Sequence, residues 1–377
     1  MRLLIATPLH PPELGGPATY ARALELGLPE RGIDITLVLF STVRHLPKGI
    51  RHVVYFWKIL MCARRVDAVL ALDPVSVGFP TMLACKVLRK AFFVKIVGDY
   101  AWEQGRSRAR MWLSLDEFVH TKDVPPLVFF LRLIQKTVAR GAQKVLVPSN
   151  YLKSILCAWG IEQGKIEVIH NAVPTEVMGA VPALVHNSTG PRIVTAGRLV
   201  PWKGIHGVIT SMTAVIEKYP EAHLIIIGDG PDRIALELFA QARIPGEHVI
   251  FTGALSHPEA LAVIASADVF VLNSTYEGLS HILIEAMYLA RPIVATSVGG
   301  NSELLTDRET GLLVGVDETG SVSRSIIELL NNKILATDLG QRAKVKSGDF
   351  SIERMLDATS LFFKANVRAP LATRHEP

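Results

Sequence analysis

The chain has 377 residues, 49% of them hydrophobic and 20% charged, which is enough apolar material for two domains rather than one. Its three cysteines have neither the even number of a disulfide framework nor the spacing of a zinc site. No apolar run approaches the roughly 18 residues that span a bilayer, and the first apolar run is too short for a signal peptide. The sequence therefore predicts a soluble, cytoplasmic protein.

Apolar runs alternate with helix-like stretches along the chain, which is typical of parallel α/β sheets. In the first half, the predicted strands are Arg2–Thr7, Ile35–Phe40, Ala68–Leu72, Phe92–Val97, Lys144–Pro148 and Ile166–Ile169. The predicted helices there are Thr19–Leu28, Gly78–Arg89, Leu127–Arg140 and Tyr151–Ala158. We expect these elements to form an N-terminal, acceptor-side Rossmann-like domain of residues 1–173.

The second half repeats the scheme after a stretch rich in Pro, Gly, Asn and Ser, residues 174–190, which predicts a linker. Its predicted strands are Arg192–Ala196, His223–Ile227, Val249–Phe251, Val269–Asn273 and Ile293–Thr296. Its predicted helices include Gly207–Tyr219, Arg233–Arg243, Pro258–Ala265 and Ile282–Leu289. We expect a second Rossmann-like domain over 191–348 and a C-terminal segment over 349–377 with a helix at Ser351–Lys364. Two doubly wound domains of this kind face each other across a cleft at the carboxyl ends of their strands.

Charge divides unevenly between the halves. Residues 1–186 contain 23 Lys and Arg against 14 Asp and Glu, a net charge of +9, and the remaining residues contain 17 against 21, a net charge of −4. The basic stretches of the first half are Arg44–Lys58, Arg64–Arg65, Lys86–Lys95 and Arg106–Arg110, with Phe56, Trp57, Phe92, Phe93 and Trp112 among them. This pattern favours peripheral contact with anionic lipid. Nucleic-acid binding, for which no motif is present, and plain solvated helix faces are the alternatives.

A loop with two cations follows the predicted strand Arg192–Ala196. It runs Gly197-Arg198-Leu199-Val200-Pro201-Trp202-Lys203-Gly204. Arg198 can bind a phosphate with two parallel hydrogen bonds, and Lys203 can act as a point charge. The loop therefore suits a diphosphate, although two solvated surface cations are the simpler interpretation of the motif by itself.

A second loop, Glu277-Gly278-Leu279-Ser280, leads into the predicted helix, and Glu285 lies just over one turn inside it. The free N–H groups and the dipole at a helix start bind phosphate, and glycine allows close approach of the backbone. A carboxylate beside an anion site repels the anion itself but accepts hydrogen bonds from hydroxyl groups. This indicates a sugar near Glu277 and a ribose near Glu285. A capped surface helix with two solvated glutamates is the alternative.

Three glycine turns complete the pattern. Gly228-Asp229-Gly230-Pro231 is similar to the start of a dinucleotide fingerprint, but Arg233 occupies the third glycine position, which argues against a nicotinamide cofactor. Gly299-Gly300 precedes Glu303 near the start of the next helix. Gly15-Gly16 follows the first strand, where bare backbone suits contact with a diphosphate and where a tight turn alone also requires glycine.

In this order, the motifs resemble those of retaining glycosyltransferases of family 4, which have the GT-B fold and use nucleotide sugars. The resemblance extends over nearly the whole chain, and its specific matches lie mainly in the second half. It implies that the last helix crosses back to the first domain, that Arg198 and Lys203 neutralise the donor diphosphate, and that Glu277 and Glu285 bind the transferred sugar and the ribose. The other implied donor contacts are Gly15, Gly16, Gly197, Gly228, Gly230, Gly278, Leu279, Ser280, His281 and Glu303.

The resemblance also implies transfer of a hexose-type sugar with retention, by front-face attack of an acceptor hydroxyl. Many glycosyltransferases hold a metal with an Asp-x-Asp motif, which this sequence lacks. We therefore expect metal-independent transfer, with fixed cations stabilising the leaving group, and no cofactor besides the co-substrate. A saccharide or polyprenyl-linked acceptor is expected, in polysaccharide synthesis at the inner face of the membrane.

One segment departs from the family pattern. Many members carry a His-Asp pair after the fourth strand of the first domain, and here the pair is Gly98-Asp99. Asp99 is still expected to contact the sugar or the acceptor, and Trp102 is a candidate for stacking on a sugar. His10, His120 and His281 are the alternative histidines.

Two other functions fit the same motifs. One is a nucleotide-sugar epimerase or hydrolase, and the other is a non-catalytic nucleotide-sugar-binding subunit. The sequence leaves the donor base, the sugar, the acceptor and the oligomeric state open, and the Gly253–Pro258 segment is where we expect base recognition.

Overall fold

A computed structural model of the chain describes residues 1–11, 13, 15–108, 111–173, 179–182, 190–244, 246–316 and 318–367. The chain forms two compact units, one comprising residues 1–172 with those from Ile352 onward, and the other Val173–Ser351. Most of the predicted linker, residues 174–178 and 183–189, lies outside the described residues, as does 368–377 of the C-terminal segment.

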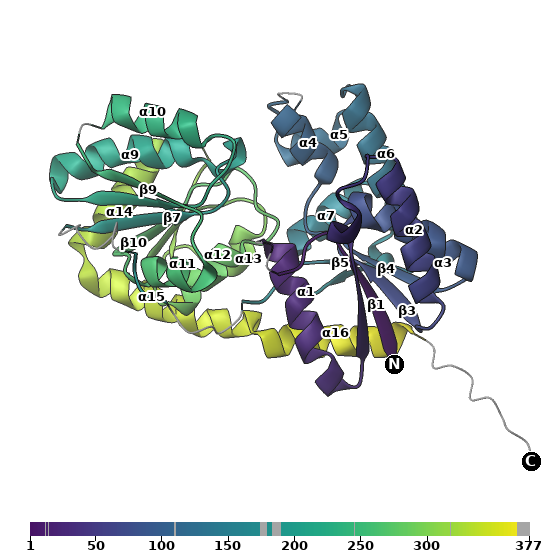
Figure 1. Cartoon of the computed structure of the whole chain (residues 1–377). Helices are drawn as coiled ribbons and strands as arrows, with labels where there is room; N and C mark the ends of the chain where they lie inside the picture. Colours follow the sequence, from purple (N-terminus) through teal and green to yellow (C-terminus); the bar gives the residue numbers. More distant parts are fainter. Residues whose placement is uncertain are drawn as a thin grey trace, which may run out of the picture. The chain divides into compact units, whose positions relative to one another are not determined.

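The first unit is built on a six-stranded parallel sheet with the order β2-β1-β3-β4-β5-β6 (Figure 1). Its strands are β1 (Arg2–Thr7), β2 (Asp34–Leu39), β3 (Ala68–Ala71), β4 (Ala91–Lys95), β5 (Lys144–Val147) and β6 (Ile166–Val168). Strand β1 pairs Leu3 with Ile35 on one side and with Ala68 on the other. The central strands are continuous apolar runs because helices cover both faces of a parallel sheet.

The helices of the first unit are α1 (Gly16–Gly27), α2 (Ile50–Ala63), α3 (Phe79–Leu88), α4 (Tyr100–Arg108), α5 (Leu115–His120), α6 (Pro126–Gly141), α7 (Asn150–Ala158) and α16 (Ile352–Asn366). Short helical turns lie at Pro29–Arg31, Phe40–Val43, Pro74–Gly78 and Gln163–Lys165. Helices α1 and α16 share a core with one face of the sheet, whose central residues include Leu3, Leu70 and Phe93. The sheet also contacts α2, α3 and α6.

The last helix of the chain belongs to the first unit. Its Phe362 and Phe363 pack edge-on against Phe93 of β4, with ring centroids 5.4 and 5.3 Å apart. Both phenylalanines lie in the same core as Leu24 of α1. The predicted return of the C-terminal helix to the first domain is therefore confirmed.

The second unit has another six-stranded parallel sheet, in the order β12-β11-β10-β7-β8-β9 (Figure 1). Its strands are β7 (Arg192–Ala196), β8 (His223–Ile227), β9 (Val249–Gly253), β10 (Val269–Leu272), β11 (Ile293–Thr296) and β12 (Leu312–Val314). Its helices are α9 (Ile205–Lys218), α10 (Arg233–Arg243), α11 (His257–Ala265), α12 (His281–Tyr288), α13 (Asn301–Leu304), α14 (Thr319–Asn331) and α15 (Lys333–Ser347). Short turns lie at Pro201–Lys203 and Gly348–Phe350.

Two cores confirm the doubly wound α/β class of the second unit. One packs α9, α10 and α14 against the sheet, and the other packs α11, α12 and α13 against it. The chain leaves β7 toward β8 and β9 on one side, and continues from β10 toward β11 and β12 on the other. In such sheets ligands bind where the order reverses, beyond the carboxyl ends of the two central strands. Here these strands are β7 and β10.

The sequence-based assignment missed β12, α2, α4, α5, α14 and α15, whereas the helix expected near Glu303 is α13. Most other boundaries agree to within two or three residues. None of the helices in the described part of the chain is both long enough and apolar enough to span a membrane.

Candidate functional site

The loops that follow β7, β10 and β11 are bonded to one another through their backbones. The Thr275 N–H, after β10, donates to the Trp202 carbonyl in the β7 loop at 2.8 Å, and the Gly300 N–H, after β11, donates to the Glu277 carbonyl at 3.0 Å. The predicted phosphate-binding segments, far apart in sequence, therefore meet at the reversal point of the sheet.

Two glycines make this close approach possible. Gly228 has a φ of +129°, and a Cβ there would lie 2.0 Å from the Gly197 carbonyl oxygen. A Cβ on Gly300 would lie 2.4 Å from the Gly278 carbonyl oxygen. Any other residue would separate the loops, so these glycines are required by the packing of the site itself.

Lys203 and Glu277 form an ion pair inside the site. The Lys203 Nζ donates to Glu277 Oε1 at 2.6 Å, and the side chains are 18% and 9% exposed. The Ser274 hydroxyl donates to the same oxygen at 2.6 Å. The structure thus brings together two residues that the sequence assigned to the diphosphate and to the sugar, and it adds Ser274, which fixes the carboxylate.

Arg198 lies in the same β7 loop and is exposed to solvent. The start of α12 is near Glu277 in sequence, and its N-cap residue, Ser280, makes no side-chain capping bond. Gly278, Leu279 and Ser280 are buried, and His281 is the first residue of the helix. An uncapped helix start beside Lys203 is suited to an anion.

Glu285 is buried in α12 and contacts a histidine that the sequence did not single out. The His257 Nε2 lies 2.9 Å from Glu285 Oε1, and the side chains are 31% and 9% exposed. His257 begins α11 and lies within the Gly253–Pro258 segment where base recognition is expected. Only the fold could indicate this contact, because 28 positions separate the two residues.

The turn after β8 also joins the site. The Gly228 N–H donates to the Gly253 carbonyl at 2.9 Å, which ties the turn to the end of β9. Arg233 occupies the position of the third glycine of a dinucleotide fingerprint. It forms ion pairs with Asp229 at 3.3 Å and with Glu237 at 2.8 Å. A Cβ on Gly230 would lie 2.3 Å from the Leu199 carbonyl oxygen. Glu303 lies half-buried in α13.

In the first unit, Asp99 is 1% exposed and holds the start of α4. Its Oδ1 accepts from the Trp102 N–H at 2.9 Å and from Gln135 Nε2 at 2.8 Å. Burial raises the pKa of this carboxyl, and the bond from Gln135 works in the opposite direction. Its Oδ2 has no partner among the described residues. The structure therefore gives Asp99 a structural task, and its contact with a sugar or acceptor stays a prediction.

Several aromatic side chains lie elsewhere than predicted. Trp102 is 1% exposed and donates to the Leu113 carbonyl at 2.9 Å, so the expected stacking on a sugar is wrong. Phe92 and Phe93 are buried because β4 is a central strand, and they form no part of a basic surface. Trp57 and Trp112 are exposed as predicted, at 57% and 74%.

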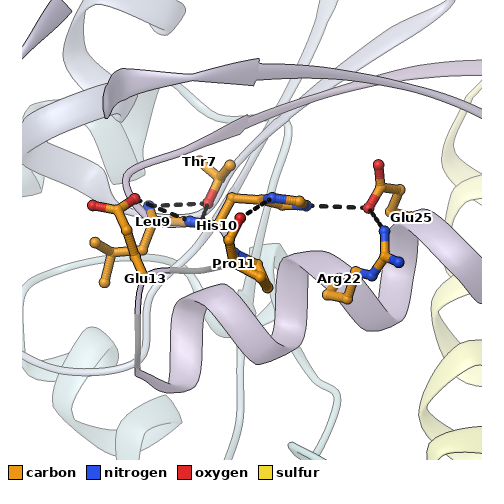
Figure 2. Close-up of polar contacts among 7 residues, drawn as sticks. All are labelled: Thr7, Leu9, His10, Pro11, Glu13, Arg22 and Glu25. Atoms are coloured by element: carbon orange, nitrogen blue, oxygen red, sulfur yellow. Dashed lines mark hydrogen bonds and ion pairs between the residues drawn. The ribbon is translucent and has the colours of Figure 1, made fainter. Parts of the chain in front are cut away.

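The loop after β1 is tied to α1, as Figure 2 shows. The His10 Nε2 lies 3.1 Å from Glu25 Oε2, and Arg22 donates to the same oxygen at 2.7 Å. Gly15 has a φ of +136° and caps α1, whose first residue is Gly16. These contacts give His10 and Gly15 local structural tasks, while His120 lies exposed at the end of α5.

Among the residues that the structure describes, no three His, Cys, Asp or Glu side chains are grouped as metal ligands.

Comparison with known proteins accounts for the arrangement of these loops. A family model described as "Glycosyl transferases group 1" matches residues 181–346, and one described as "Glycosyltransferase Family 4" matches residues 100–177. These two segments of the chain belong to this glycosyltransferase family. The first match contains every loop of the site in the second unit, from Gly197 to Glu303.

Curated family members are similar over part of their length. The alpha-D-kanosaminyltransferase of Streptomyces kanamyceticus is 30% identical over 41% of this chain and 40% of its own. The lipopolysaccharide core biosynthesis glycosyltransferase LpsE of Rhizobium meliloti is 29% identical, over 52% of this chain and 56% of its own. A GDP-mannose-dependent phosphatidylinositol monomannoside mannosyltransferase of Mycobacterium tuberculosis is 27% identical, over 55% and 58%. The chain thus matches about half the length of these relatives.

Solved structures share the fold over almost the full chain. Sucrose-phosphate synthase from Thermosynechococcus elongatus has a TM-score of 0.78 at 18% identity, covering 97% of this chain and 98% of its own. Anabaena HepE in complex with UDP-glucose has a TM-score of 0.76 at 16% identity, covering 97% and 100%. These neighbours confirm the GT-B fold of this glycosyltransferase family member.

Proposed function

We propose that this chain is a retaining, metal-independent glycosyltransferase. It transfers a hexose-type sugar from a nucleoside-diphosphate donor to a hydroxyl of a saccharide or lipid-linked acceptor. The observation that supports the proposal most is the convergence of Lys203, Glu277 and the start of α12 where the strand order reverses between β7 and β10. Each of these groups suits a different part of one ligand.

The donor diphosphate binds against Lys203, Arg198 and the backbone N–H groups at the start of α12. Lys203 holds Glu277 in this structure, and an arriving phosphate competes for the same ammonium group. Glu277, fixed by Ser274, then accepts hydrogen bonds from hydroxyls of the transferred sugar. Glu285, held on one oxygen by His257, has its other oxygen for the ribose.

In the transfer step, the bond between the anomeric carbon and the diphosphate oxygen breaks, and a bond from the acceptor oxygen to the same face of that carbon forms. The acceptor proton moves to the departing phosphate, so no protein nucleophile is needed. Negative charge accumulates on the leaving group, where fixed cations and oriented N–H groups stabilise it most. In this chain Lys203 and Arg198 supply the cations, in a sequence without an Asp-x-Asp motif.

The acceptor class is proposed from the relatives together with the basic first unit. The relatives include enzymes named for lipopolysaccharide core biosynthesis and for mannosylation of phosphatidylinositol monomannoside. A lipid-linked acceptor fits a first half with a net charge of +9, because anionic lipid attracts basic protein surface. We place the reaction at the inner face of the membrane.

A turnover assay separates this function from its alternatives. The protein is incubated in EDTA with UDP-, GDP- or ADP-sugars, with and without a membrane lipid extract as acceptor source. Transfer predicts acceptor-dependent release of nucleoside diphosphate and a glycosylated product that retains the donor's anomeric configuration. Free sugar formed without acceptor indicates a hydrolase, an altered sugar nucleotide indicates an epimerase, and binding without turnover indicates a non-catalytic subunit. Any of these three results would contradict the proposal.

A further inference from the structure

Three helices, α2, α3 and α6, form a layer on the first unit (Figure 1). Helix α2 packs beside α3, and α3 packs beside α6. Their inner sides are buried in the usual way, with Tyr55 and Ile59 of α2 and Val138 of α6 fully covered. We call their outer side the α2–α3–α6 face.

This face exposes large apolar side chains on every one of its helices. The exposed residues are Ile50, Val53, Trp57 and Met61 on α2, Leu83 and Val87 on α3, and Leu127, Phe129, Phe130 and Leu133 on α6. Those on α2 are between 55% and 58% exposed and recur every three or four residues, so they form one stripe along the helix. Single exposed apolar residues are ordinary, but ten on three adjacent helices indicate an interaction surface.

The charged residues of these three helices have one sign. The 14, 10 and 16 residues of the three helices include no Asp or Glu. They include six cations, Arg51, Lys58, Lys86, Arg132, Lys136 and Arg140. By contrast, every described α-helix of the second unit contains at least one Asp or Glu. These three helices therefore carry +6 of the net +9 of residues 1–186, and Lys58, Lys86 and Arg140 among their cations are exposed.

A groove of about 530 Å³ opens at one edge of the face, along the sheet-edge strand β2. Leu37, Leu39, Val54, Trp57 and Met61 line it. Lys58 is exposed beside it, with its Nζ 2.9 Å from the Thr42 hydroxyl. The groove thus has apolar walls and an ammonium group at its entrance, which matches the two ends of an anionic lipid.

We propose that the α2–α3–α6 face binds an anionic lipid bilayer. The apolar stripe of α2 and the phenylalanines of α6 enter the boundary between headgroups and acyl chains, and the basic side chains extend toward the lipid phosphates. Each cation near such a surface is attracted to the negative potential of the lipid phosphates. The biological purpose of this contact, access to a lipid-linked acceptor, rests on the proposed function, whereas lipid binding itself does not require donor or turnover.

Sedimentation with vesicles tests the proposal without any substrate. The full chain is mixed with vesicles of phosphatidylcholine alone, or of phosphatidylcholine and phosphatidylglycerol in equal amounts. The matched variants are Val53→Ser/Trp57→Ser on α2 and Ile234→Ser/Leu238→Ser on α10, whose residues are also exposed, at 73% and 62%. A second face variant, Phe129→Ser/Phe130→Ser on α6, guards against a local folding defect on α2.

We expect the wild type and the α10 variant to bind the anionic vesicles and to be released by salt. We expect each face variant to bind at least tenfold more weakly. Equal binding by the face variants and the wild type would overturn the proposal, as would equal binding to neutral vesicles. No binding to either vesicle, with or without self-association of the chain, would also overturn it. Donor binding measured on the same preparations separates this failure from a failure of the proposed transferase.

Discussion

Lys203 places a positive charge in the site where we expect the donor diphosphate to bind. Its ammonium group is bonded to Glu277 in the structure, so replacing it by alanine would leave a buried carboxylate with Ser274 alone. Lys203→Gln keeps a donor for Glu277 and removes only the charge. We expect affinity for the nucleoside diphosphate to fall about 10- to 100-fold, since a charge-assisted bond contributes about 1.5–3 kcal/mol. Calorimetric titration measures it.

Lys333 supplies the control for this substitution. It pairs with Asp268 at 3.0 Å, at the amino end of β10 and hence at the opposite edge of the same sheet. Lys333→Gln should leave nucleotide affinity unchanged. If both variants bound as tightly as the wild type, Lys203 would have no part in binding the diphosphate.

Substitutions of Glu277 and Glu285 should affect the binding of different ligands. Glu285→Gln is expected to weaken the binding of free nucleoside diphosphate and of nucleotide sugar by the same factor, because Glu285 contacts the ribose that both ligands contain. Glu277→Gln is expected to weaken only the binding of the nucleotide sugar. Titration with both ligands checks the division, and equal losses from the two variants with both ligands would contradict it.

His257 should act through Glu285 rather than on the ligand. Its Nε2 lies 2.9 Å from the carboxylate, so His257→Leu is expected to weaken nucleotide binding severalfold while kcat at saturating donor is kept. His257→Gln, which retains a donor group, is expected to restore most of the affinity. A loss of kcat with unchanged KM in the leucine variant would show that positioning of the ribose is not its role.

Lys95 gives the first unit a dependence on pH. Its side chain is 1% exposed, with Nζ 3.8 Å from the centre of the Tyr20 ring and 3.4 Å from the Ile169 carbonyl oxygen. Burial lowers the pKa of this amine from its ordinary value of 10.5 to about 7. Between these two values the unfolded chain binds a proton that the folded chain does not, so the free energy of unfolding rises with pH across this window.

Lys95→Met removes that dependence and keeps a similar side-chain volume. We expect the variant to be more stable than the wild type near pH 7, because a buried amine is costly. Its advantage should shrink by up to about 1.4 kcal/mol per pH unit as the pH rises toward 10. Urea unfolding at several pH values measures the difference. A difference that does not change with pH would mean that Lys95 titrates alike in both states.

At the scale of elements, α16 joins the two ends of the chain in one core. Phe363 is fully buried against Phe93, and Leu361 on the same helix is 68% exposed. Phe363→Ala should lower the free energy of unfolding of the first unit by about 3–5 kcal/mol, whereas Leu361→Ala should change it by less than about 0.5 kcal/mol. Chemical denaturation compares the two. Equal, small effects would mean that α16 is not an integral part of this core.

Elements with a distinctive local pattern could be predicted from the sequence, and elements without one could not. The buried strands β1, β7, β8 and β11 were predicted to the residue, because an apolar run between turn signals is distinctive. Helix α2 was missed because its outer side is as apolar as its inner side, which hides the helical period. Strand β12 has three residues, which is too short for any period.

At the scale of the whole molecule, sheet order explains why separate motifs form one site. The sequence predicted that Arg198, Lys203, Glu277 and Glu285 follow strand ends, and the structure places these strands next to each other. It could not predict the contacts within the set. Lys203 and Glu277 are 74 positions apart and His257 and Glu285 are 28 apart, so their pairing depends on loop packing that no local pattern encodes. The capping role of Asp99 was missed for the same reason, since Gln135 comes from another helix.

We infer that the second unit binds a nucleotide sugar through fixed cations rather than a metal. The most direct test is calorimetric titration of the intact chain with UDP-, GDP- and ADP-sugars in EDTA. We expect binding of one nucleotide class, undiminished by the chelator and weakened by Lys203→Gln. Absence of binding to all three, or binding that appears only when a divalent cation is added, would contradict it.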